Sequence, residues 1–229
     1  MLTFPSRQDC AYAKCYCEEN IWKLCEWISH KCPSEVDNCY VIFISNQEKT
    51  IPLWKQVAGS LDQDHLVVWD YHVIMLRLSS DQLSKDSSAS VWIYDMDSVL
   101  PYPIHFSDYF TLALRPNEVL LPPYHRKFRL IPARVFLKEF ASDRSHMETP
   151  SGEWRETPPD WPPIRTEVTE NNIQDFWDMS EQSPANRFSV VVEGTDELLT
   201  KIENLRNEMN ITGNPENKLN HSIDIRDSA

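Results

Sequence analysis

The sequence predicts a fold of the α/β class, more narrowly α+β, in which a mostly antiparallel sheet packs against helices. Residues 17–28 carry apolar side chains at helical spacing, whereas residues 66–76 and 91–97 alternate with the period of a β-strand. The polar stretch 79–90 between the two strand segments is typical of a mobile hairpin loop, which favours antiparallel pairing. Because 41% of the 229 residues are hydrophobic, the chain can bury one sizeable core.

The first predicted element is an amphipathic helix that begins at Cys17. Its core-facing stripe consists of Ile21, Leu24, Cys25 and Ile28. Cys17 lies one helical turn before Ile21 and continues this stripe at the helix N-terminus. Unpaired N–H groups and the positive end of the helix dipole favour a thiolate there and can receive an oxyanion. Glu18 and Glu19 oppose the thiolate, so its formation needs a further cation. The alternative interpretation is a half-buried structural cysteine.

The other elements are predicted in chain order from the same two periodicities. We expect strands at 40–44, 66–76, 91–97 and 126–131, a segment at 51–55 that pairs with the first strand, and helices at 105–114 and 134–140. Residues 1–180 are predicted to form the main domain. Residues 181–229 are predicted to form a separate C-terminal segment that is partly disordered, with disorder in the last twenty residues. The resemblance described below makes this the divergent part of the chain. Its one candidate helix has apolar positions at Leu198, Leu199, Ile202, Leu205 and Met209.

The register of the hairpin decides which polar side chains meet. The expected opposed pairs are Leu76 with Val91, Ile74 with Ile93, and His72 with Asp95. The aliphatic pairs support this register because opposed side chains lie about 5 Å apart. The next pair, Asp70 with Asp97, opposes two like charges, so we expect the pairing to fray or bulge there. A slip by one residue puts His72 and Asp95 on opposite faces of the sheet.

A histidine beside a carboxylate, together with a cysteine at a helix N-terminus, supplies the parts of a Cys–His–Asp triad. In this hypothesis His72 provides the cation that the Cys17 thiolate needs, and Asp95 orients the imidazole ring. Asp97 is the competitor for the third role. The structural alternative is a core histidine, His72, that is satisfied by Asp95. The chain order of the three residues, with the histidine and aspartate on neighbouring strands, is that of the papain and transglutaminase-like architecture.

Composition argues against several other classes of protein. With 22 Lys+Arg and 35 Asp+Glu, the net charge is −13, which disfavours nucleic-acid binding through a basic face. Only 4 glycines occur, and neither phosphate-binding glycine motif is present. No apolar run reaches the roughly 18 residues of a membrane span, and the first residues lack a signal peptide. We therefore expect a cytoplasmic protein, with the nucleus as a second compartment.

All six cysteines fall within the first 39 residues. Without a secretory signal, a reducing compartment is expected, so the thiols are predicted to be free. The cluster contains no CxxC motif and its spacings are irregular, which disfavours structural zinc. We expect no metal and no cofactor.

Several strings, in order along the chain, resemble the WDYHV family of protein N-terminal glutamine amidohydrolases. The strings are Cys15–Trp22 (CYCEENIW), Phe43–Asn46 (FISN), Trp69–Val73 (WDYHV), Tyr94–Asp97 (YDMD) and Phe140–Met147 (FASDRSHM). The resemblance covers roughly residues 10–179 and implies a papain/transglutaminase-type fold. The implied activity is deamidation of an N-terminal glutamine side chain to glutamate with release of ammonia. The implied triad is Cys17, His72 and Asp95.

The resemblance also implies partners and leaves alternatives open. The expected substrates are peptides and proteins with a free N-terminal glutamine, the expected state is a monomer, and a role in the N-degron pathway is implied. Candidates for binding the substrate α-ammonium are Glu18, Asp70 and Asp97. The loop after Leu78 is longer than is usual for the family, and no family match is found beyond Met179. The alternatives are a cysteine protease, a transglutaminase-like acyltransferase, and a catalytically impaired protein that binds N-terminal residues.

Overall fold

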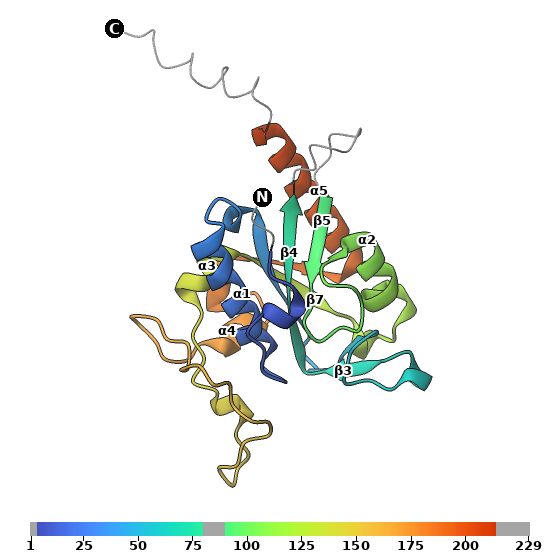
Figure 1. Cartoon of the computed structure of the whole chain (residues 1–229). Coiled ribbons are helices and arrows are strands. Elements are labelled where there is room, and N and C mark those ends of the chain that lie inside the picture. Colours follow the sequence, from blue (N-terminus) through green and yellow to red (C-terminus); the bar gives the residue numbers. More distant parts are fainter. Residues whose placement is uncertain (1–3, 80–89, 214–229) are drawn as a thin grey trace, which may run out of the picture.

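A computed structural model describes residues 4–79 and 90–213 and shows an α+β fold built on a six-stranded antiparallel sheet (Figure 1). The strand order is β6-β5-β4-β1-β7-β8. The strands are β1 (Cys39–Ser45), β4 (Tyr71–Ser79), β5 (Ser90–Tyr94), β6 (Ile104–His105), β7 (Lys127–Pro132) and β8 (Val190–Glu193). A separate two-stranded sheet pairs β2 (Ile51–Leu53) with β3 (Val67–Trp69). The predicted hairpin loop and the predicted disordered tail lie largely outside the described residues.

Helices cover both faces of the large sheet. They are α1 (Cys17–Lys31), α2 (Phe106–Tyr109), α3 (Ala133–Glu139), α4 (Ile173–Trp177) and α5 (Gly194–Gly213). Figure 1 shows α1, α3 and α4 on one side of the sheet and α2 and α5 on the other. One core cluster joins α1, α3 and α4 to one face of β1 and β4, and a second joins α2 and α5 to the other face. The central strand therefore buries alternate residues on opposite sides, Val41 and Phe43 on the α1 side and Ile42 and Ile44 on the α5 side.

The local elements largely follow the predicted pattern. Helix α1 begins at Cys17, and its stripe is buried in the core as predicted. The predicted helix at 105–114 is divided into α2 and a π-helical turn over Phe110–Leu114. The single strand predicted at 66–76 is interrupted at Asp70, whose Oδ1 accepts the backbone N–H of Tyr71 at 2.9 Å. As a consequence β2 pairs with β3 and not, as expected, with the first strand.

The predicted register of the hairpin was wrong by two residues. In the structure Leu76 faces Ile93 and Leu78 faces Val91, and the ladder ends where Met75 faces Tyr94. This register brings Leu78 into the aliphatic pairing, and the predicted opposition of two aspartates does not occur because the ladder ends before them. A shift of two residues preserves the alternation of faces, so the histidine and the aspartate remain on the same side of the sheet.

The C-terminal part of the chain continues the fold. Strand β8, which the sequence analysis did not predict, pairs with β7, and α5 follows it directly. The predicted helical positions lie within α5, where Leu198, Ile202 and Leu205 are buried against the sheet. None of the described helices combines the length and the apolarity that a bilayer-spanning segment requires. The six cysteines all lie in the described part of the chain, and none forms a disulfide.

Candidate active site

Cys17 is the first residue of α1, and its side chain is buried against the sheet with 9% of the residue exposed. The N-cap residue Tyr16 makes no side-chain capping bond, so the first N–H groups of the helix are not capped from that position. The backbone N–H of Val73 donates to the Cys17 sulfur, which places the thiol beside the residue that follows His72. Burial raises the pKa of Cys17 well above its usual value, and the charges of Glu18 and Asp97 raise it further.

His72 and Asp95 form a buried pair at the ends of neighbouring strands. The Nε2 atom of His72 lies 3.0 Å from Oδ1 of Asp95, and both side chains are 1% exposed. Three further donors hold the aspartate: the Tyr109 hydroxyl at 2.8 Å, the Gln56 amide at 3.1 Å and the backbone N–H of Asp97 at 3.0 Å. The carboxylate is thus fixed from four directions.

The pair favours a protonated histidine. Burial by itself lowers the pKa of His72, but the charge and hydrogen bond of Asp95 outweigh it, so the His72 pKa is raised. Burial likewise favours a neutral Asp95, yet the charge of His72 and the hydrogen bonds to the carboxylate outweigh it and lower the Asp95 pKa. The raised pKa favours the charged form of His72, which is the form that the sequence analysis required.

Asp97 lies close to this pair but has a different environment. One ring nitrogen of His72 and one carboxylate oxygen from each of Asp95 and Asp97 lie within 4.8 Å of one another. The Tyr12 hydroxyl donates to Oδ1 of Asp97 at 2.6 Å. Burial raises the pKa of Asp97, the charge of Asp95 adds to the effect, and the charge of His72 opposes it. Three such groups are close enough to share a cation, although Nε2 of His72 is already paired with Asp95.

Glu18 belongs to a buried polar group that the sequence analysis did not predict. Its Oε2 accepts the Tyr71 hydroxyl at 2.9 Å and the Cys17 thiol at 3.6 Å. The Nε2 atom of His146 lies 3.3 Å from the Tyr71 hydroxyl and 3.6 Å from Oε1 of Glu18. His146 therefore reaches the residue next to Cys17. Its presence in the FASDRSHM string was the available sequence signal.

The second acidic residue of the helix, Glu19, is neutralised by an ion pair. Arg144 donates from Nε and Nη2 to the two carboxylate oxygens, each at 2.8 Å, and the Trp161 indole N–H donates at 2.7 Å. Glu19 is fully buried and the Arg144 side chain is 6% exposed. The arginine also donates to the backbone carbonyl of Trp161, so the chain around Trp161 is fixed against the first turn of α1. This pair offsets part of the negative charge near Cys17.

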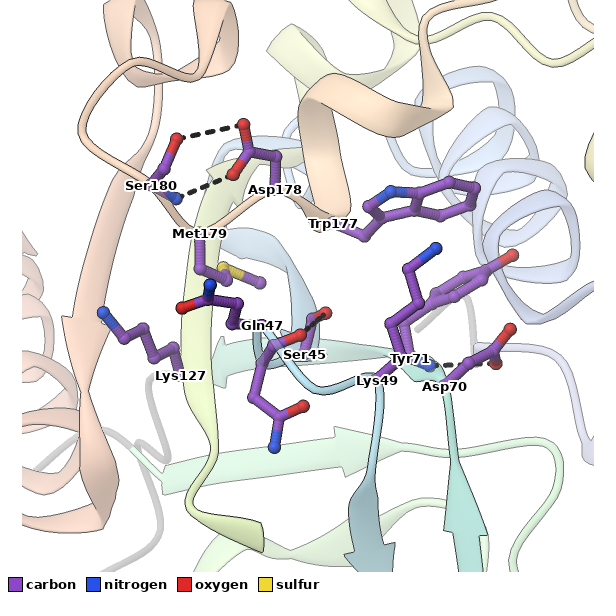
Figure 2. Close-up of a pocket in the computed structure, with 11 residues that line it drawn as sticks. Ser45, Gln47, Lys49, Asp70, Tyr71, Lys127, Trp177, Asp178, Met179 and Ser180 are labelled. Carbon is purple, nitrogen blue, oxygen red and sulfur yellow. Dashed lines mark hydrogen bonds between the residues drawn. The ribbon is translucent and has the colours of Figure 1, made fainter. Parts of the chain in front are cut away.

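A cavity of about 310 Å³ lies next to these residues and is shown in Figure 2. Its lining consists of Ser45, Asn46, Gln47, Lys49, Asp70, Tyr71, Lys127, Trp177, Asp178, Met179 and Ser180. Tyr71 and Trp177 form one wall, with ring centroids 4.9 Å apart. None of the three predicted triad residues lines the cavity. Tyr71 connects the two regions, because its ring lines the cavity and its hydroxyl reaches Glu18.

The chain matches the family model of N-terminal glutamine amidase over residues 12–202, a range that extends past Met179 into α5. Protein N-terminal glutamine amidohydrolase of Bos taurus is 48% identical over 175 residues, which cover 76% of this chain and 80% of that protein. The Homo sapiens protein of the same name is 47% identical over 175 residues, covering 76% and 81%. The Drosophila melanogaster protein is 44% identical over 177 residues, covering 77% and 82%.

Proposed function

The chain belongs to the N-terminal glutamine amidase family, and from this premise we propose that it hydrolyses the side-chain amide of an N-terminal glutamine through Cys17, His72 and Asp95. The products are a peptide or protein with N-terminal glutamate, and ammonia. The observation that carries the proposal is the buried His72–Asp95 pair, whose Nε2–Oδ1 distance is 3.0 Å. The Val73 N–H that donates to the Cys17 sulfur supports the placement of the thiol beside this pair.

The reaction begins with proton transfer from the Cys17 thiol. Burial raises the Cys17 pKa and favours the thiol form of the side chain, which needs a base to become a nucleophile. Nε2 of His72 bonds Asp95, so Nδ1 is the ring nitrogen that remains for exchange of protons with the reacting groups. The thiolate then attacks the side-chain amide carbon, and its electron pair forms the C–S bond. The N–H groups at the start of α1 bind the oxyanion that develops.

The second half of the reaction regenerates the enzyme. The protonated His72 donates its proton to the departing nitrogen, the C–N bond breaks, and ammonia leaves a thioester on Cys17. The neutral imidazole then takes a proton from water, and the resulting hydroxide attacks the thioester carbon. The C–S bond breaks, the sulfur regains a proton, and glutamate is released. Asp95 stabilises the imidazolium form in both halves.

The experiment that tests the proposal is mass spectrometry of a Gln-initiated peptide after incubation with the purified protein. The same peptide with an acetylated N-terminus is the control substrate. The expected result is a mass change equal to replacement of an amide NH₂ by OH, in the free peptide only and with an intact backbone. Cys17→Ser, checked for a native circular dichroism spectrum, is expected to abolish the change. Cleavage of the peptide, crosslinking to an amine, or binding without release of ammonia contradicts the proposal and identifies a protease, an acyltransferase or a binding protein.

The proposed activity implies a cellular setting. An N-terminal glutamate produced from glutamine is a substrate for arginylation, so we assign the protein a role upstream of that step in the N-degron pathway. The six free thiols support a reducing compartment, the cytoplasm with the nucleus as a second location. We further propose that the protein acts as a monomer on peptides, without nucleic acid or membrane partners. Light scattering coupled to size exclusion tests the oligomeric state.

A further inference from the structure

Asp97 is a buried carboxylate without a lysine or arginine partner in the described part of the chain. The residue is 7% exposed, and among the described residues it forms no ion pair with lysine or arginine. Its backbone N–H donates to Asp95, and its Oδ1 accepts the Tyr12 hydroxyl at 2.6 Å. Among the described residues, the hydrogen bond to its side chain is the one that Tyr12 donates to Oδ1, and none is made to the other oxygen, Oδ2. One oxygen is thus held in place while the other remains free to accept a donor.

The environment of Asp97 favours the binding of a cation. Burial of a carboxylate without a counter-charge is unfavourable, and here it raises the pKa of Asp97. His72 only partly compensates, because its Nε2 is bonded to Asp95. A cationic donor placed against Oδ2 gains a charge-assisted hydrogen bond in a site from which most water is excluded.

The distance from the reacting centre fits a free α-ammonium group. In an extended glutamine the α-nitrogen lies about 5 Å from the side-chain carbonyl carbon, given standard bond lengths. A carboxylate oxygen of Asp97 lies within 4.8 Å of a ring nitrogen of His72. When the amide carbon is in contact with Cys17 and His72, the α-nitrogen of the same residue can therefore reach this carboxylate.

The two other acidic candidates fit less well. Glu18 is fully buried, and its Oε2 already accepts the Tyr71 hydroxyl. Its Oε1 has no hydrogen-bond partner but is enclosed by the protein, with Nε2 of His146 at 3.6 Å, so a substrate cannot reach it without movement of the side chains around it. Asp70 is exposed at the rim of the cavity in Figure 2, where solvent and salt weaken its attraction for a cation.

We propose that Asp97 binds the α-ammonium group of the N-terminal glutamine and that Tyr12 is the positioning residue that holds the Asp97 carboxylate. The inference rests on the proposed function and adds to it the residue that restricts the enzyme to a free N-terminus. Tyr12 lies in the segment before α1 and is 45% exposed, and its hydroxyl bond to Asp97 links it to the site.

The test is peptide binding to the Cys17→Ser variant, measured by calorimetry. Two peptides are compared, one that begins with glutamine and one with the same sequence and side-chain amide but without the α-amino group. Asp97→Asn in this background is expected to weaken binding of the first peptide about a hundredfold, because a buried charge loses its partner. Binding of the second peptide is expected to remain unchanged. Asp70→Asn is the matched control for loss of one negative charge and is expected to preserve the preference for the amine.

Each result decides the inference. An equal loss for both peptides, no loss for either, or loss of the preference in Asp70→Asn overturns it. If Asp97→Asn does not fold, Tyr12→Phe replaces it as the test, because Tyr12 is partly exposed. This variant is expected to reduce the preference for the peptide with the α-amino group severalfold, and an unchanged preference contradicts the inference. Release of ammonia by the wild-type protein is measured in parallel. If the wild-type protein releases ammonia but Asp97→Asn still binds the peptide with the α-amino group more tightly than the peptide without it, the inference alone is refuted. If binding depends on the α-amino group and on Asp97 but the wild-type protein releases no ammonia, the proposed function alone is refuted.

Discussion

The indole ring of Trp69 stacks on the imidazole ring of His72, with ring centroids 5.5 Å apart and an angle of 16° between the planes. The indole N–H donates to the side-chain oxygen of Gln56 at 3.3 Å, and the Gln56 amide donates to Asp95. Because Asp95 in turn pairs with His72, the four side chains form a closed set of contacts around the imidazole. The ring is held both in its plane and along its hydrogen bond.

This arrangement predicts that Trp69 acts on catalysis through His72. An aromatic pair is worth about 0.5–1.5 kcal/mol, which corresponds to a rate factor of up to about ten. Trp69→Leu is therefore expected to lower kcat by up to about tenfold, and Trp69→Phe, which keeps a stacking ring, by less. Steady-state measurement of ammonia release with a Gln-initiated peptide checks this. A normal kcat for Trp69→Leu contradicts a role for the stack.

The raised pKa of His72 predicts the pH dependence of the reaction. Neutral imidazole must accept the thiol proton, so kcat/KM increases with pH through the pKa of His72. Because Asp95 raises this pKa, the acid limb of the profile is expected above the ordinary value of 6.5. In Asp95→Asn the charge is gone and burial remains, so the limb is expected to move below 6.5 while the maximum rate falls. A limb at the same pH in both proteins indicates that another group controls it.

The buried Glu19–Arg144 pair predicts a large effect on stability. Glu19→Gln leaves the Arg144 guanidinium buried without its counter-charge, which is expected to lower the free energy of unfolding by about 3–5 kcal/mol. The control is Glu170→Gln, in the pair with Arg165 whose side chains are 58% and 67% exposed. This control is expected to change stability too little to resolve. Urea denaturation of both variants provides the measurement, and equal effects contradict the assignment of a buried pair.

The sequence predicted those features that depend on local periodicity. The helical repeat placed Cys17 at the start of α1, and strand alternation placed His72 and Asp95 on one face of the sheet. The register was wrong by two residues without loss of this relation, because alternation has a period of two. The choice between registers depended on Leu78, which the expected pairing left out.

The other contacts of the site depend on residues that are far apart in the sequence. Arg144 reaches Glu19 across 125 positions, and Tyr12 reaches Asp97 across 85. No periodicity relates such residues, so only the folded chain reveals that Glu19 has an arginine partner and that Asp97, among the described residues, has no lysine or arginine partner. Strand β8 was missed for a related reason. It is a short edge strand of four residues, and its strand conformation depends more on its pairing with β7 than on its own sequence.

Helix α5 predicts a contrast between two adjacent leucines. Leu198 is 1% exposed in the core on the face of the sheet opposite α1, whereas its neighbour Leu199 is 39% exposed. Leu198→Ala creates a cavity and is expected to lower the free energy of unfolding by about 2–5 kcal/mol. Leu199→Ala is expected to change it by less than about 0.5 kcal/mol. Both variants, measured by urea denaturation, are expected to keep the wild-type kcat at a temperature where they remain folded, because the sheet separates α5 from Cys17. Equal stability of the two variants contradicts the packing of α5 on the sheet and, with it, the contribution of the C-terminal residues to the fold.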